Sequence, residues 1–427
     1  MKLSINKEFR NAGWIIGEQV FQMLVSLIVG VLSARYLGPS NYGLINYTGS
    51  FVTFVTSITT LGMDSVVIKK MIESPQREGE YLGSCMVYRL VAALVSSAGI
   101  ISVVWVLNPG DTLMLTLVSL QSIQLFFRAI SLLDAWFQRY LKSKYVSLAK
   151  MLACVIVSAY RICLLIFAKD IRWFALSNTL TAAVTAIVLI VAYARKRTQK
   201  LSFSFPAAND TLKDSYHFII SGLMTAIYGQ MDRIMLGEMM SAESVGLYTT
   251  AATICTMWLF VPTAIIHSLQ PGILECKKSG NESAYLHRLK RLYAIIIWLC
   301  IVVSLGVFVF GDLAVRILYG EAYAGAAGSL KILIWSETFA MIGSMRGVWI
   351  LAEKKNKYVK HYLGMGAALN LLVNFLLIPK LGIAGASAAT LATQIFTSLI
   401  APLLFKATRV HTKLVLQAVV YPFSPKR

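Results

Sequence analysis

Residues 288–310 of the chain read RLKRLYAIIIWLCIVVSLGVFVF, in which Arg291 is followed by an uncharged run as far as Phe310. A helix needs about 20 predominantly apolar residues to cross the hydrocarbon core of a bilayer. The whole chain of 427 residues has a similar character, because 57% of its residues are hydrophobic, 14% are charged and the mean hydropathy is +0.67. Even a large soluble domain buries only about three quarters of its unfolded surface. We therefore expect lipid to be the solvent for most of this chain.

Twelve segments of this kind follow one another along the sequence. They lie near residues 11–34, 42–63, 82–107, 112–133, 146–168, 172–194, 216–238, 245–271, 288–310, 328–352, 358–378 and 383–405. The pattern predicts an all-α polytopic membrane protein with about 12 transmembrane helices. The first segment is too long for a signal peptide, so we expect it to act as the insertion signal and to stay in place.

The distribution of Lys and Arg between the connections predicts the orientation. The N-terminus, the even-numbered loops and the C-terminal tail carry about 28 basic residues, which is the excess expected of the cytoplasmic side. The odd-numbered loops carry only Arg35, Lys169, Arg172, Arg316 and Lys380. We expect a multi-pass membrane protein with both termini in the cytoplasm. The net charge of +20 then reflects orientation and not nucleic-acid binding.

The longest polar connection divides the predicted helices into two sets of six. It covers residues 197–214, contains Pro206 and follows the basic run RKR at 195–197. We expect an N-terminal six-helix bundle at 1–196, this stretch as a cytoplasmic linker, and a C-terminal six-helix bundle with a short cytoplasmic tail at 215–427. Because each half has an even number of helices, an internal repeat would be of the parallel kind.

Signatures of soluble enzymes are missing from the sequence. It contains no Walker A loop, no GxSxG and no HExxH, and its five histidines are scattered. The six cysteines show no CxxC or Cys/His metal spacing and lie mostly within the apolar runs. We expect no enzymatic activity, no catalytic residue, no cofactor and no bound metal.

Eight of the charged residues within the apolar segments are singled out here, because a charge within a span normally faces a partner or a water-filled cavity. The cations, predicted to line a substrate-binding cavity, are Arg89, Arg128, Arg161, Arg233 and Arg346. The carboxylates, predicted to serve in ion coupling or in ion pairs, are Glu18, Asp232 and Glu337. Other roles stay open: two of the arginines, Arg89 and Arg128, could extend to an interface. The neighbours Asp232 and Arg233 could anchor a helical hairpin, and acid–base pairs could hold helices together.

Several arginines within apolar helices favour an anionic ligand with many oxygen atoms. Guanidinium stays protonated, donates bidentate hydrogen bonds to phosphate and is more weakly hydrated than ammonium. The expected ligand class is therefore a phosphate or a diphosphate. A partly desolvated carboxylate beside an arginine can change its protonation when substrate binds, which would permit coupling to protons or to sodium.

Four segments carry a resemblance to a known family. They are ARYLGPSNYGLINY at 34–47 with LGMDSVVIKK at 61–70, DAWFQRYLKSKYVSLAK at 134–150, DRIMLGEMMSAESVGLYTTAATI at 232–254, and NFLLIPKLGIAGASAATL at 374–391. In this order they make the chain similar to the polysaccharide flippases (Wzx-type O-antigen and exopolysaccharide exporters) of the multidrug/oligosaccharidyl-lipid/polysaccharide exporter superfamily, the MOP superfamily.

The resemblance implies two pseudo-symmetric six-helix bundles in a V around a central cavity, with alternating access by rocking of the halves. It also implies a polyprenyl-diphosphate-linked oligosaccharide as substrate and cavity arginines that hold its diphosphate. Of the arginines above, Arg233 lies inside one of the matching segments. The sequence continues only a short way beyond the twelfth predicted helix, unlike that of longer members of the family.

We therefore predict a flippase of the bacterial cytoplasmic (inner) membrane for O-antigen (lipopolysaccharide), capsule or exopolysaccharide biosynthesis, with membrane lipids and polysaccharide polymerase machinery as further partners. Within transport, the alternatives are an exporter of lipid II or of drugs. An alternative of another class is a polytopic membrane enzyme, such as a polysaccharide polymerase or an acyltransferase. That alternative would be expected to have large outward loops, and the odd-numbered loops here are short.

Overall fold

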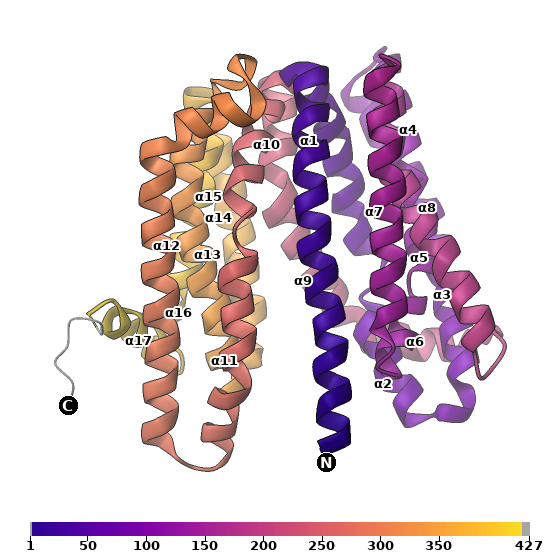
Figure 1. Cartoon of the computed structure of the whole chain (residues 1–427), viewed down its shortest axis with the longest axis vertical. Helices are drawn as coiled ribbons and strands as arrows, with labels where there is room; N and C mark the ends of the chain where they lie inside the picture. Colours follow the sequence, from indigo (N-terminus) through magenta and orange to yellow (C-terminus); the bar gives the residue numbers. More distant parts are fainter. Residues whose placement is uncertain (1, 421–427) are drawn as a thin grey trace. The chain divides into compact units, whose positions relative to one another are not determined.

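The computed structural model describes residues 2–420, and this part of the chain consists of helices and turns without a strand (Figure 1). The helices up to the predicted linker are α1 (Lys2–Thr59), α2 (Met63–Glu73), η1 (Pro75–Arg77), α3 (Glu78–Leu107), α4 (Thr112–Ser122), α5 (Gln124–Ile130), α6 (Leu133–Arg139), α7 (Ser143–Ile166) and α8 (Ile171–Lys196). Those that follow it are α9 (Phe205–Met239), α10 (Ala242–Thr256), α11 (Phe260–Lys278), α12 (Glu282–Tyr319), η2 (Glu321–Tyr323), α13 (Ala326–Ala352), η3 (Asn356–Tyr358), α14 (Val359–Leu381), α15 (Ile383–Ile395), the π-helix η4 (Phe396–Ile400), α16 (Ala401–Leu404) and α17 (Arg409–Val420).

The prediction of an all-α polytopic membrane protein is confirmed. Within the described residues, nine stretches of helix are long and apolar enough to cross a membrane, and the first of them, Gly13–Glu73, contains two of the twelve predicted segments. The two predicted segments outside these nine stretches lie in α9 and α13. These two helices carry half of the charged residues singled out from the sequence, because Asp232, Arg233, Glu337 and Arg346 lie on them.

The first two predicted segments run into each other at Gly38. This residue has φ 71° and ψ 168°, and Pro39 follows it. A positive φ is unstrained only for glycine, and proline has no N–H for the helical ladder and disfavours helical geometry in the residue before it. The sequence Gly38-Pro39 therefore forces a break, although helix continues on both sides with hardly any loop between them.

Helix contacts divide the described residues into two compact units. Unit 1 contains the chain up to Leu37 together with Leu44–Gln230, and unit 2 contains Gly38–Gly43 and the chain from Met231 onwards. The division falls within α9, whose first residues, from Phe205 on, make the second part of the predicted linker helical. The predicted bundle limits at 196 and 215 stay a prediction.

The first part of the linker, residues 197–204, is bound along the start of α3 in unit 1. The backbone N–H of Ser202 donates to the carbonyl of Gly79 at 3.2 Å, and that of Ser204 donates to Oγ of Ser84 at 2.8 Å. A Cβ on Gly83 would lie 2.4 Å from the carbonyl oxygen of Ser202. The chain can approach this closely only because α3 presents glycine there.

Unit 2 is built around α12 and α13, whose buried side chains include Tyr285, Tyr293, Met345 and Trp349. At another point of this unit, the 38–43 segment crosses the start of α10. Here a Cβ on Gly43 would lie 1.7 Å from the carbonyl oxygen of Ala242. The two backbones are therefore in direct contact. Only glycine permits so close an approach, because any other residue would place a Cβ against the carbonyl.

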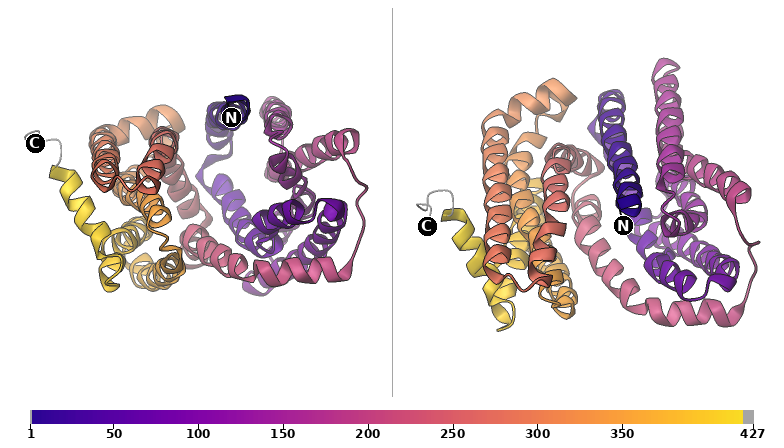
Figure 2. Two further views of the ribbon diagram at one scale, coloured as in Figure 1. Left: turned by 90° about the horizontal axis from the view of Figure 1, so that it is seen from below. Right: turned by 60° about the horizontal axis from the view of Figure 1, so that its bottom comes forward.

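Part of the predicted cytoplasmic tail forms α17. Its buried residues include His411, Leu414, Val415 and Ala418, which share one face of a helix because their spacing is i, i+3, i+4 and i+7. This face packs on α12 and α13. Figure 2 shows α17 in yellow lying crosswise against α12, which is seen nearly end-on in its left panel.

Candidate functional site

The carboxylate of Asp232 is the centre of a buried polar cluster in unit 2. Asp232 lies in α9 and is 5% exposed. Its oxygens accept hydrogen bonds from Tyr248 Oη at 2.6 Å and Thr390 Oγ1 at 2.6 Å, and from the amide nitrogens of Asn370 at 3.1 Å and Asn374 at 2.5 Å. The donors come from α10, α14 and α15. Burying a carboxylate is costly unless its charge is hydrogen-bonded or paired, and this cluster supplies four donors.

Two oxygens of the same cluster have no hydrogen-bond donor among the described residues. They are Oδ1 of Asn370 and Oδ1 of Asn374, both shielded from solvent. Together with Asp232 and the hydroxyl of Thr390, they form a set of oxygen atoms of the kind that hard cations prefer. The described residues contain no group of three or more His, Cys, Asp and Glu that could hold a metal ion.

Arg346 lies in α13 of unit 2 and is half-buried. Its Nη1 donates to the backbone carbonyl of Thr397, and its guanidinium lies 4.5 Å from the centre of the Tyr362 ring. The acceptor belongs to the π-helix η4, a helix type whose wider turn displaces carbonyls from the ordinary ladder and is frequent at functional sites. The arginine is thus oriented by two neighbouring elements.

Arg233 lies beside Asp232 in α9 and is half-buried. It directly follows Asp232 in sequence, so α9 fixes the backbone position of both residues. The other predicted carboxylate of unit 2 is Glu337 in α13, which is partly buried close to Cys255 and Cys300. No hydrogen bond or ion pair of Glu337 is formed with the residues that the structure describes.

The remaining three predicted arginines belong to unit 1. Arg89 in α3 is 1% exposed and pairs with Asp64 of α2 at 3.0 Å. Arg128 in α5 is exposed, and its Nε donates to Oε1 of Gln124 at 3.3 Å. Arg161 lies half-buried in α7. Contact of these side chains with a substrate stays a prediction.

Glu18 in α1 belongs to a separate charged group of unit 1. It is 5% exposed, and the charges of Lys150 and Asp134 act on it. Those two residues approach each other to 4.0 Å. The eight predicted residues therefore lie in several places, and of these only Asp232 and Arg233 are neighbours in sequence.

Sequence reasoning missed the four partners of Asp232. Tyr248 and Thr390 lie in segments quoted above for their family resemblance, and nothing in these segments marks the two residues as partners of a buried carboxylate. A signal was available for the other two, because Asn370 and Asn374 are four residues apart and so share one face of an apolar helix. Two amides on one face of a membrane helix need partners there.

Residues 9–276 match the family described as "Polysaccharide biosynthesis protein". The chain belongs to this family. The resemblance predicted from the four segments is thereby confirmed, and the flippases among the relatives indicate a transporter and not an enzyme, as predicted.

Relatives and solved structures agree with this assignment. The chain is 22% identical over 363 residues to the "Probable low-salt glycan biosynthesis flippase Agl15" of Haloferax volcanii, covering 84% of this chain and 75% of that protein. Its fold is similar to that of the lipid II flippase MurJ in an inward closed conformation, with a TM-score of 0.75, 15% identity and coverage of 96% and 92%. It is also similar to an inward-facing multidrug resistance MATE family transporter, with a TM-score of 0.66, 14% identity and coverage of 91% and 96%.

Proposed function

We propose that this protein is a flippase that carries polyprenyl-diphosphate-linked oligosaccharide repeat units across the cytoplasmic membrane by alternating access, for O-antigen, capsule or exopolysaccharide biosynthesis. The observation that carries the proposal is the placement of five arginines on apolar helices in a chain of the polysaccharide biosynthesis family. A guanidinium binds phosphate in a bidentate manner and stays charged at any physiological pH. The substrate's diphosphate is the part of it that lipid would exclude most strongly.

In the proposed cycle the cytoplasmic-open state admits the diphosphate and sugar while the polyprenyl tail stays in lipid. Arg128, Arg161, Arg233 and Arg346 compensate the negative charge of the diphosphate. Arg89 pairs with Asp64, and in this cycle it positions α2 and α3. Rocking of the halves would then expose the sugar to the other side, and no covalent bond is made or broken.

Asp232 is the proposed site of ion coupling. Its carboxylate and the two free amide oxygens beside it could hold either a proton or sodium, both of which the sequence left open. Because Arg233 follows directly in the same helix, occupation of the cluster would act on an arginine proposed to bind substrate. Asp232→Asn should then abolish the dependence of transport on an ion gradient.

The experiment that tests the proposal is leaflet exchange in proteoliposomes. A polyprenyl-diphosphate-linked oligosaccharide is placed in one leaflet, and its arrival in the other is followed by its access to an added glycosidase. We expect Arg161→Ala and Arg346→Ala to lower the rate at least tenfold, because a charge-assisted contact is worth about 1.5–3 kcal/mol. The matched control is Arg172→Ala, which removes an exposed arginine at the start of α8.

Wild-type rates in both test variants would contradict the proposed binding role. The same assay decides between the alternatives, because lipid II shares the diphosphate and differs only in its sugar and peptide. Transport of lipid II in preference to the oligosaccharide lipid would assign the chain to that substrate. A drug exporter for organic cations is disfavoured by the excess of arginine over carboxylate within the spans.

A further inference from the structure

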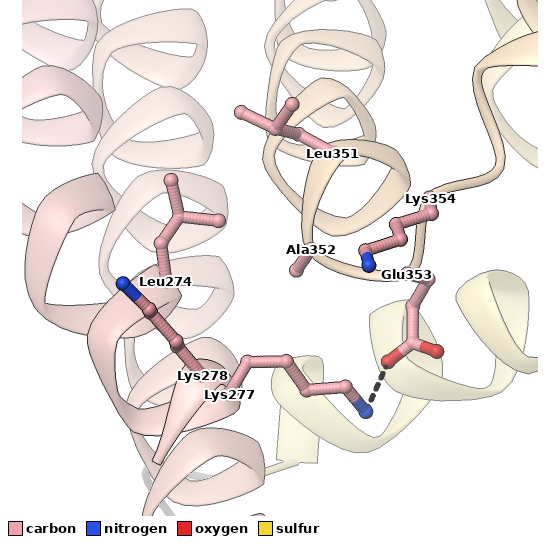
Figure 3. A pocket seen from close by; sticks show the side chains of 7 residues that line it. All are labelled: Leu274, Lys277, Lys278, Leu351, Ala352, Glu353 and Lys354. Carbon is pink, nitrogen blue, oxygen red and sulfur yellow. Dashed lines mark ion pairs between the residues drawn. The ribbon is translucent and has the colours of Figure 1, made fainter. Parts of the chain in front are cut away.

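A pocket of about 570 Å³ lies at one end of unit 2, away from the Asp232 cluster. It is formed by the last turn of α11 and by the end of α13 with the turn that follows (Figure 3). Its lining residues are Leu274, Lys277, Lys278, Leu351, Ala352, Glu353 and Lys354. The sequence predicts this end of the unit to be cytoplasmic, because the connections after α11 and α13 are rich in Lys and Arg.

The three lysines of the pocket are in different electrostatic states. Lys277 forms ion pairs with Glu353 at 2.8 Å and with Glu282 at 3.1 Å. Lys278 and Lys354 are exposed and form no ion pair with a residue that the structure describes. The carboxylate of Glu353 is occupied by Lys277 and by the hydroxyl of Tyr285 at 3.1 Å. The pocket therefore keeps two uncompensated positive charges.

Three of the seven residues that line the pocket are apolar, namely Leu274, Leu351 and Ala352. Figure 3 shows Lys278 on the side of α11 and Lys354 on the side of α13, with Leu274 and Leu351 above them. Leu351 is 46% exposed. Leu274 is half-buried. A cationic rim beside these two aliphatic side chains suits a phosphate that is attached to a hydrocarbon chain better than a free polyanion, which would leave the exposed aliphatic surface in water.

The backbone of the turn fixes one of the lysines. Lys354 has φ 55°, a left-handed conformation that is unfavourable for a residue with a Cβ. The N–H of Lys355 donates to the carbonyl of Ile350 at 2.9 Å, which closes the end of α13 around this residue. Glycine or asparagine would be favoured at such a helix end. The backbone of Lys354 is therefore strained, and this strained position carries one of the ammonium groups of the pocket.

We propose that this pocket binds the phosphate of a membrane lipid in the cytoplasmic leaflet, with Lys278 and Lys354 as its cationic contacts and Leu274 and Leu351 as contacts for the adjoining hydrocarbon. The lipid phosphate could belong to an anionic phospholipid or to a polyprenyl diphosphate. None of the arginines of the proposed transport route lines this pocket, so the proposal of a lipid site does not depend on their role.

The test uses the full-length protein in nanodiscs of phosphatidylcholine, with binding measured by native mass spectrometry or by fluorescence. Three probes are added separately: phosphatidylglycerol, a polyprenyl diphosphate, and inorganic pyrophosphate. The test variant combines Lys278→Gln with Lys354→Asn, because asparagine tolerates the left-handed backbone and keeps the turn folded. The matched control is Lys360→Ala, which removes an exposed lysine of α14 outside the pocket lining.

We expect the double variant to bind at least one of the two lipids about 30-fold more weakly, because each lysine near a membrane surface contributes about 1 kcal/mol, while Lys360→Ala binds like the wild type. Loss for phosphatidylglycerol alone identifies a bound phospholipid, and loss for polyprenyl diphosphate alone identifies the carrier lipid. Unchanged binding of both lipids would overturn the proposal. So would equally tight, lysine-dependent binding of inorganic pyrophosphate, because the hydrocarbon would then contribute nothing.

Discussion

The four groups that donate to Asp232 come from three helices other than its own. At the scale of single residues, this makes one carboxylate the meeting point of α9, α10, α14 and α15. A buried charge with several donors orders the groups around it, and the loss of one donor leaves part of the charge unsatisfied. Substitutions here should therefore be felt as losses of stability as well as of transport.

Tyr248→Phe tests the structural part of this role. It removes one donor from Asp232 and keeps the ring, so the free energy of unfolding should fall by about 1.5–3 kcal/mol, the range for a hydrogen bond to a charged group. Thermal unfolding of the purified protein measures the change. The control is Tyr216→Phe, which removes the hydroxyl of a tyrosine that is 51% exposed in α9. Equal stability of the two variants would show that the hydroxyl of Tyr248 is dispensable.

Glu353 gives a prediction on pH. Although burial raises the pKa of Glu353, the hydrogen bonds from Lys277 and Tyr285 outweigh it and leave the pKa below its usual value. A carboxyl group whose pKa is lower in the folded state stabilises that state above its unfolded pKa, and the stabilisation is lost as the pH falls through the folded pKa. The pair with Lys277 should therefore contribute its full share at neutral pH and lose it in acid.

Lys277→Met should lower the free energy of unfolding by about 1 kcal/mol at neutral pH, which is the upper range for a partly exposed ion pair. The difference from the wild type should shrink when the pH is lowered below the ordinary carboxyl range. Thermal unfolding across a pH series checks this. Lys278→Met is the control, since it removes the neighbouring charge without breaking an ion pair. A difference that stays constant down to acid pH would contradict the assignment.

At the scale of helices, the crossing of residues 38–43 with α10 is the tightest contact that a substitution can probe. Gly43→Ala would place its Cβ against the carbonyl of Ala242, where only a shift of backbone can relieve the overlap. We expect a loss of about 1–3 kcal/mol, as for overpacking of a core, measured by thermal unfolding. Gly99→Ala in α3 is the matched control, since nothing lies within 4 Å of its Cβ position. It should be neutral or slightly stabilising.

The positions of the long helices could largely be predicted from the sequence, but the connections between them could not. Apolar runs of sufficient length indicated every long helix, because the bilayer imposes that length. The near-continuous helix across Gly38 could not be predicted, because a Gly-Pro sequence indicates a bend in the chain but not how many loop residues the bend contains. The helix α17 was missed because its 12 residues are too short to span, although His411, Leu414, Val415 and Ala418 have amphipathic spacing. The partners of Asp232 were missed because they come from three other helices, of which only α10 is next to α9 in sequence.

For the molecule as a whole, the sequence predicts which end of each helix faces the cytoplasm. In a variant without native cysteines, Lys196→Cys should react with a membrane-impermeant maleimide only after permeabilisation, and Lys169→Cys should react in intact cells. Both positions are exposed in the structure, so the membrane alone should decide the labelling. The opposite pattern would invert the predicted topology and move the proposed lipid pocket to the other leaflet.

The helix α9 continues without a break through the point where the two units divide, after Gln230. The preceding stretch, residues 197–204, is hydrogen-bonded to α3 and is therefore not a free loop. The chain therefore passes from unit 1 to unit 2 at this point as a helix and not as a loop, so any change in this connection must bend or twist α9. Gly229, with open space around its Cβ position, is the place where such flexing costs least.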